Sequence, residues 1–165
     1  MVTKCRYCGS SQVAVQNSFI TSGLCASCAR DLLSTRDHTQ RFINSFSEPI
    51  LFMRDGPRLV VAANRRAARL FGKDLVRIRG LRSGQVFDCI HSTGDSARGP
   101  GPACKSCRID KAVKETFAFK KASSKIYKLL EVLRHTQTIP YHLEVSTEPM
   151  GDYALLRVER YSQAE

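Results

Sequence analysis

Seven cysteines are the residues of this sequence whose type and spacing could do chemistry. They form two groups, one near the N-terminus and one past the middle of the chain: Cys5, Cys8, Cys25 and Cys28, then Cys89, Cys104 and Cys107. An odd number of cysteines does not complete a disulfide framework. Clustered cysteines in a reducing compartment are typical of metal or redox chemistry. The sequence therefore predicts metal-binding or redox-active thiols.

The first group consists of two Cys-x-x-Cys pairs. Two residues between cysteines let a tight turn direct both sulfurs at one ion, and two such turns make the tetrahedral thiolate cage of structural Zn²⁺. An iron centre or a redox dithiol is the alternative. Residues 1–34 hold few large apolar side chains, and so small a segment needs a staple to fold. We predict a zinc ribbon over residues 1–34, whose closed site leaves no position for catalysis.

The rest of the chain has the pattern of an α+β domain. Residues 35–45 predict a connecting helix, and residues 46–162 predict the domain that follows it. Apolar spacing and turn residues place helices at 65–71 and 108–119, and strands at 50–53, 58–62, 125–134, 138–147 and 153–159. Asn64 is placed to cap the first of these helices, and Gly72 to end it. Strands at both ends with helices between them predict one antiparallel sheet with helices on one face.

The formal net charge of the chain is +11. Between residues 65 and 82 lies a basic stripe in which Asp74 is the only acid: Arg65, Arg66, Arg69, Lys73, Arg77, Arg79 and Arg82. Such a stripe can attract nucleic acid or an acidic protein, and it can equally be a solvated face. No apolar run approaches the roughly 20 residues of a membrane helix, and the N-terminus lacks a signal-peptide core, so a cytoplasmic location is expected.

The region from about Thr39 to Arg160 resembles the PAS family of sensory domains. The resemblance rests on segments at 46–55, 59–64, 67–72, 143–150 and 153–156. It implies a five-stranded antiparallel sheet with helices over one face, and a function in sensing ligands, redox state or partners. The segment around Cys89 does not match the flavin-binding motif of light sensors, and the helix over 108–119 contains no histidine for haem. Neither flavin nor haem is therefore expected.

The second cysteine group resembles a subgroup of bacterial PAS domains that carry Cys-Ile-His, Gly-Cys-Gly and Cys-x-x-Cys segments. Cys89 and His91 match the first segment, and Cys104 and Cys107 match the last. The middle cysteine would fall near Arg98, so one ligand implied by the resemblance is missing. His91 would complete a Cys₃His metal site with the three cysteines, or the thiols would be redox-active. A plain structural role is the third interpretation.

The leading prediction is a sensory or regulatory module. No kinase, cyclase or helix-turn-helix follows the last predicted strand, so a signal would pass to a separate signalling protein or through a homodimer. Exposed Phe42 or Phe46 on the connecting helix would support a homodimer. The runner-up is a nucleic-acid-binding or transcription-associated regulator, which rests on the zinc ribbon and the basic stripe. Phosphate loops, HExxH and GxSxG motifs are absent from the sequence, so we predict that the chain is not an enzyme.

Overall fold

The computed structural model describes residues 2–4, 11–13, 36–56, 58–92 and 102–165. Within the first 34 residues it describes two short strands, β1 (Val2–Lys4) and β2 (Ser11–Val13), which pair antiparallel. The four cysteines of the predicted zinc ribbon lie outside the described residues: Cys5, Cys8, Cys25 and Cys28. The zinc ribbon therefore stays a prediction.

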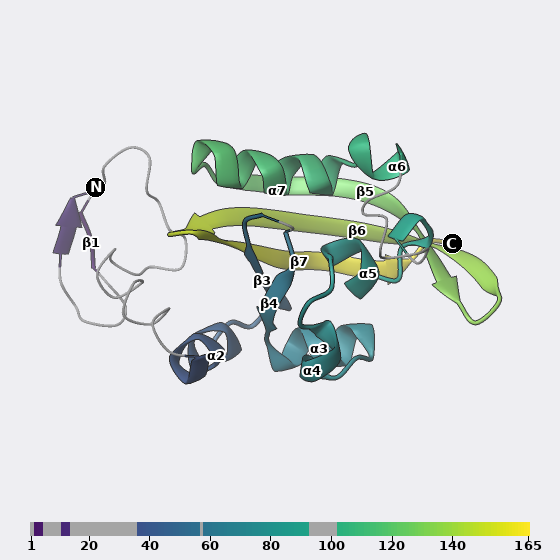
Figure 1. The fold of residues 1–165 in the computed structure, drawn as a ribbon, viewed down its shortest axis with the longest axis horizontal. Helices are drawn as coiled ribbons and strands as arrows, with labels where there is room; N and C mark the ends of the chain where they lie inside the picture. Colours follow the sequence, from purple (N-terminus) through teal and green to yellow (C-terminus); the bar gives the residue numbers. More distant parts are fainter. Residues whose placement is uncertain (1, 5–10, 14–35, 57, 93–101) are drawn as a thin grey trace.

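A five-stranded antiparallel sheet in the order β4-β3-β7-β6-β5 forms the body of the fold (Figure 1). Its strands lie where the sequence predicted them: β3 (Ile50–Arg54), β4 (Val60–Ala63), β5 (Ser123–Arg134), β6 (Gln137–Met150) and β7 (Tyr153–Gln163). The last three strands are longer than predicted. Two-residue turns join them, each beginning at a residue with positive φ, His135 at 56° and Gly151 at 61°. Turns this tight let the pairing run to the ends of the strands.

Most of the helices lie between β4 and β5 in the chain and cover one face of the sheet. They are α3 (Arg65–Phe71), α4 (Leu75–Ile78), α5 (Ser83–Val86), the 3-10 helix η1 (Ile90–Ser92), α6 (Pro102–Lys105) and α7 (Arg108–Phe119). Helix α7 runs along the long strands (Figure 1), and its buried residues Ile109, Val113 and Phe117 join the main core as their spacing predicted. Alternate strand residues such as Leu51 and Met53 face the same core.

Helix α2 (Arg36–Asn44) packs on the opposite face, which differs from the expectation of one covered face. Its Ile43 is fully buried against Ile50 and Phe52, whose neighbours along β3 face the main core. Phe42 and Phe46 are half-buried beside this second cluster, with ring centroids 5.2 Å apart. The apolar side of α2 is thus largely occupied within one copy of the chain, because strands β3, β4 and β7 offer it apolar residues.

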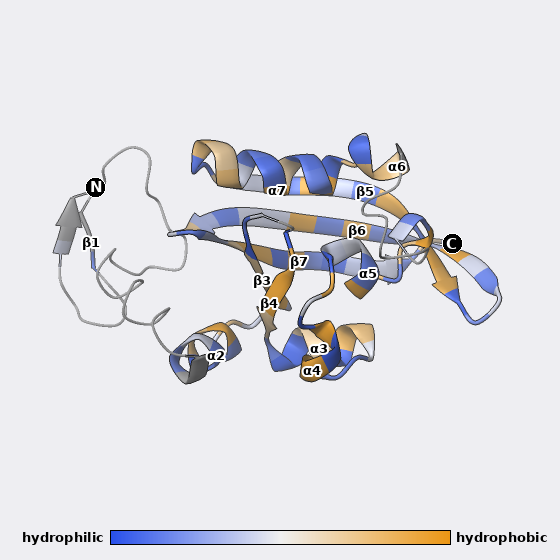
Figure 2. Ribbon diagram, in the orientation of Figure 1, coloured by the Kyte–Doolittle hydropathy of each residue, from blue (hydrophilic) through white to orange (hydrophobic). Residues whose placement is uncertain are grey.

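Colouring by hydropathy shows apolar and polar residues alternating along the long strands (Figure 2). In the part of the chain that the structure describes, no helix is long and apolar enough to cross a membrane.

Candidate thiol site

Cys89 lies in a tight turn that is attached to the edge strand of the sheet. The residue before it, Asp88, has a left-handed backbone with φ of 56°. The Leu133 amide donates to the Asp88 carbonyl at 3.0 Å, and Cys89 forms an isolated antiparallel bridge with Val132. Cys89 is only 6% exposed and belongs to the main core. This attachment holds Cys89 in the core that β5 shares with the helices.

Burial raises the pKa of the Cys89 thiol above its ordinary value. The nearby Cys104 and Cys107 act in the same direction, whereas a hydrogen bond from the His91 backbone and the Lys128 ammonium act against it. All three sulfurs are therefore close enough to interact electrostatically. Because the ordinary pKa of a cysteine already lies near 8.5, Cys89 is a neutral thiol at neutral pH.

Cys104 and Cys107 lie at the junction of α6 and α7, and both are half-buried. The Cys104 thiol donates to the His91 carbonyl at 3.9 Å, and the Cys107 amide donates to the Cys104 carbonyl at 3.2 Å. The Lys128 ammonium, on β5, donates to the Cys107 sulfur at 3.4 Å. The structure thus gathers the three predicted thiols at the point where η1, the α6–α7 junction and β5 meet.

His91 does not approach the sulfurs as a ligand would. Its side chain is exposed, and the contacts described above between His91 and the cysteines are made by its backbone. Among the described residues, no group of three or more histidine, cysteine or acidic side chains is arranged to hold a metal ion. As placed, Cys89, His91, Cys104 and Cys107 do not form a coordination cage, and the second metal site stays a prediction.

Asp88 holds the Cys89 turn through an ionic network that the sequence did not reveal. Its carboxylate accepts from the Lys73 ammonium at 2.6 Å and from the Arg134 guanidinium at 3.1 Å. Lys73 also donates to the Val86 carbonyl at 3.2 Å. In the sequence, Lys73 is one member of the basic stripe. Its pairing with Asp88 was hidden because Lys73, Asp88 and Arg134 lie far apart in the chain.

Tyr161 extends this network into the core. Arg134 donates to the Tyr161 hydroxyl at 3.3 Å, and that hydroxyl donates to the Phe87 carbonyl at 3.3 Å. The ring stacks on Tyr141 at 4.7 Å between centroids and meets Phe71 edge-on at 5.1 Å. Burial, only partly offset by Arg134, raises the pKa of Tyr161 to about 12.

We expect Tyr161 to ionise late and its ionisation to weaken the fold. An unfolded tyrosine ionises near pH 10. Because the folded pKa is higher, this residue's contribution to stability is fully present below about pH 10 and is lost as the pH rises towards 12. An ultraviolet titration of tyrosinate should lose one late-titrating group in Tyr161→Phe. Tyr127→Phe, which removes an exposed ring, is the control and should retain that late step. Persistence of the late step in Tyr161→Phe would contradict the assignment.

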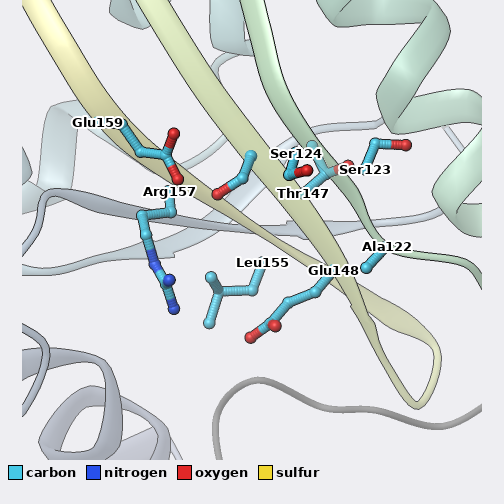
Figure 3. A pocket seen from close by; sticks show the side chains of 9 residues that line it. Ala122, Ser123, Ser124, Thr147, Glu148, Leu155, Arg157 and Glu159 are labelled. Carbon is cyan, nitrogen blue, oxygen red and sulfur yellow. The ribbon is translucent and has the colours of Figure 1, made fainter.

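A hollow of about 130 Å³ lies on the face of the sheet that packs against α2 (Figure 3). Its lining comes from β6, β7 and the start of β5, and includes Glu148, Leu155, Arg157 and Glu159. Ligand cavities in proteins usually measure roughly 300 to 1,000 Å³. We therefore assign this hollow no ligand.

No family model and no curated protein matches the chain. Among solved structures, the chain is similar to the LOV protein of Rhodobacter sphaeroides, with a TM-score of 0.52 and 15% identity. That match covers 81% of this chain and 67% of the LOV protein. Weaker similarity extends to the PAS domain of Bordetella pertussis BvgS, with a TM-score of 0.44 and 12% identity over 78% of this chain and 85% of that domain. The strand order, the helices and the first of these matches show that the chain has a PAS-like fold.

Proposed function

We propose that this chain is a signal-sensing regulatory module whose responsive element is the thiol group formed by Cys89, Cys104 and Cys107. The module is not an enzyme, and it acts through a separate protein partner or a homodimer. A structural Zn²⁺ holds its N-terminal ribbon through Cys5, Cys8, Cys25 and Cys28. The observation that carries the proposal is the meeting of three sulfurs and the Lys128 ammonium at one junction of the fold.

Oxidation of Cys104 and Cys107 is the response that the geometry favours. The two residues form a Cys-x-x-Cys turn, both are half-buried, and Cys107 accepts a hydrogen bond from a cation. Hydrogen peroxide would remove two electrons and two protons from the two thiols. The product would be one disulfide, and the peroxide would leave as two molecules of water. Cys89 is a poorer reactant because it is buried and its pKa is raised.

A change at this turn has a direct route to the sheet. Cys104 contacts the His91 carbonyl, and the chain between Asp88 and His91 is anchored to β5 by the Asp88 network. Forming or breaking a disulfide at the α6–α7 junction would change the contacts of both segments. A partner protein would then recognise the changed surface of α6 and α7.

Metal binding is the second candidate response, and the sequence pattern supports it. Cys89, His91, Cys104 and Cys107 have the donor types of a Cys₃His site. Such a site would require the His91 side chain to turn towards the sulfurs. A bound metal would also join η1 to the α6–α7 junction, so both responses would act on the same part of the fold.

Two variants of the full chain separate these responses. Cys104→Ser/Cys107→Ser removes both the disulfide and the metal site, whereas Cys89→Ala removes one metal ligand and leaves the Cys-x-x-Cys pair. Metal content and free thiols should be measured on purified protein before peroxide, after peroxide and after re-reduction. If a disulfide forms, the wild type and Cys89→Ala should both lose two thiols reversibly, beyond any loss in the double variant.

If metal is the signal, the wild type should instead carry more metal per chain than either variant. The first cysteine group is unchanged in all three proteins, so its metal and its thiols cancel in the comparison. Equal metal content and equal reversible thiol loss in the wild type and the double variant would overturn the proposed responsive element.

A further inference from the structure

Four exposed arginines of the basic stripe lie on α3 and α4, two helices that contact each other. We call Arg65, Arg66 and Arg69 on α3, with Arg77 on α4, the arginine face. All four side chains are exposed. None of them forms an ion pair or side-chain hydrogen bond with a residue that the structure describes. Asp74 is exposed beside them and is likewise without an ion pair in the described chain.

The arginine face adds nothing to the packing of α3. That helix buries Ala67 and Phe71, and its arginines lie away from these core residues. Arg65 and Arg69 are four residues apart, and Arg66 and Arg69 are three apart, so their charges are neighbours on the helix surface. Like charges at these spacings destabilise a helix. The arrangement is explained if the charges meet an anion outside the chain.

The composition of the surface distinguishes between anionic partners. Protein interfaces have an apolar core enriched in aromatic residues and depleted of charge. Here the only large exposed apolar residue on α3 or α4 is Val76, at 78% exposure. Interfaces with nucleic acid are more polar and strongly positive, and arginine binds phosphate through two parallel hydrogen bonds. We propose that the arginine face binds the phosphate backbone of nucleic acid.

The mode of binding follows from the same residues. The helices that carry the arginine face present no exposed aromatic ring, so bases have nothing to stack on there. Phosphate contacts fix position without reading sequence. Binding through this surface is therefore sequence-independent and dominated by the release of counterions. This inference goes beyond the proposed sensing function and does not depend on the cysteines.

The experiment compares two full-length variants that each remove four positive charges. One replaces the arginine face: Arg65→Gln, Arg66→Gln, Arg69→Gln and Arg77→Gln. The control replaces exposed lysines on α7, on β5 and in the segment between them: Lys111→Gln, Lys114→Gln, Lys121→Gln and Lys125→Gln. In Figure 1, α7 lies on the opposite side of the molecule from α3 and α4, so the control removes the same formal charge from another part of the surface. A thermal melt confirms that both variants are folded.

Binding is measured by fluorescence anisotropy with labelled duplex DNA, duplex RNA and single-stranded DNA, at salt concentrations from roughly 50 to 200 mM. The wild type should bind each probe with little sequence preference. Loss of the arginine face should weaken duplex DNA binding at least about tenfold, and should make the slope of log affinity against log salt shallower by about 3 to 4. The lysine control should retain most of the affinity for duplex DNA and most of the salt dependence. Asp74→Asn, which removes the one nearby acid, should tighten binding.

Three results would overturn the proposal. The first is an absence of binding to any of the nucleic acids at the lowest salt. The second is an equal loss of affinity in the two quadruple variants, because net charge would then explain the binding. The third is tighter binding to polyglutamate or to anionic phospholipid vesicles than to every nucleic acid, with the same dependence on the arginine face.

Discussion

Replacing Asn64 by alanine is expected to destabilise the PAS-like domain by about 3 to 5 kcal/mol. Asn64 is fully buried where β4 ends and α3 begins. Its Oδ1 accepts from the Ile50 amide at 2.9 Å and from the Ala67 amide at 3.0 Å. Its Nδ2 donates to the Ile43 carbonyl at 3.0 Å and to the Glu48 carbonyl at 2.8 Å. One side chain therefore joins α2, β3 and α3.

The size of the effect follows from how many groups lose a partner. An ordinary helix cap contributes about 0.5 to 2 kcal/mol. Alanine at 64 removes the cap of α3, takes the acceptor away from the buried Ile50 amide and removes a donor from the Ile43 and Glu48 carbonyls. Each buried group left unsatisfied costs about 1 to 3 kcal/mol before relaxation. Urea unfolding followed by circular dichroism measures the loss in free energy. Asn64→Asp keeps the acceptor but places a carboxylate against two carbonyls, so it should be at least as damaging as alanine.

Asn44 provides a matched control for this prediction. Its Oδ1 accepts from the Arg65 amide at 3.0 Å, so it also satisfies a backbone donor at the start of α3. That contact is exposed, and water can replace it. Asn44→Ala should therefore lower the unfolding free energy by no more than about 1 kcal/mol. Equal losses in Asn44→Ala and Asn64→Ala would show that the buried contacts of Asn64 contribute no more than a surface cap.

Asn64 also shows what could be predicted from the sequence. A polar residue before an apolar-periodic segment that ends at glycine marks a helix start, and the structure confirms both Asn64 as the cap and Gly72 as the terminating residue. The same local reasoning correctly placed α7 and all five strands. The hydrogen-bond partners of Asn64 in α2 and β3 could not be predicted, because Ile43 and Ile50 precede it by 21 and 14 residues. Only the folded β3–β4 hairpin brings them together.

Long-range charge pairing was the main limit at the candidate site. Local spacing identified the three thiols, and the structure brings them together. The residues that hold the thiols in place could not be predicted from local spacing. Lys128 is 21 residues from Cys107 in the chain, and the two meet because β5 lies beside the α6–α7 junction in the fold. Lys73 belongs to the basic stripe in the sequence, yet it pairs with Asp88 inside the fold. The arginine face consists of the exposed members of that stripe, since Arg79 and Arg82 are half-buried.

Replacing Asp88 by asparagine is expected to lower the unfolding free energy by about 2 to 3 kcal/mol. Asparagine keeps the size of the side chain and tolerates the left-handed backbone at this position. It removes the charge that lies between Lys73 and Arg134, which are 18% and 34% exposed. Two partly buried cations then lose their common anion. The Cys89 turn, which Asp88 attaches to β5, should open more often.

Asp110 is the control that decides whether this network matters. It also contacts two cations, Arg58 at 3.5 Å and Lys114 at 2.6 Å, and its side chain is 24% exposed against 23% for Asp88. Its ion pairs reach Lys114 on the same helix and Arg58 in the β3–β4 connection, and neither partner holds the Cys89 turn, so Asp110→Asn should cost no more than about 1 kcal/mol. Labelling of Cys89 by a thiol reagent should accelerate severalfold in Asp88→Asn and stay unchanged in Asp110→Asn. If the two variants behave alike, Asp88 is an ordinary surface acid and the turn that carries Cys89 is held by its backbone alone.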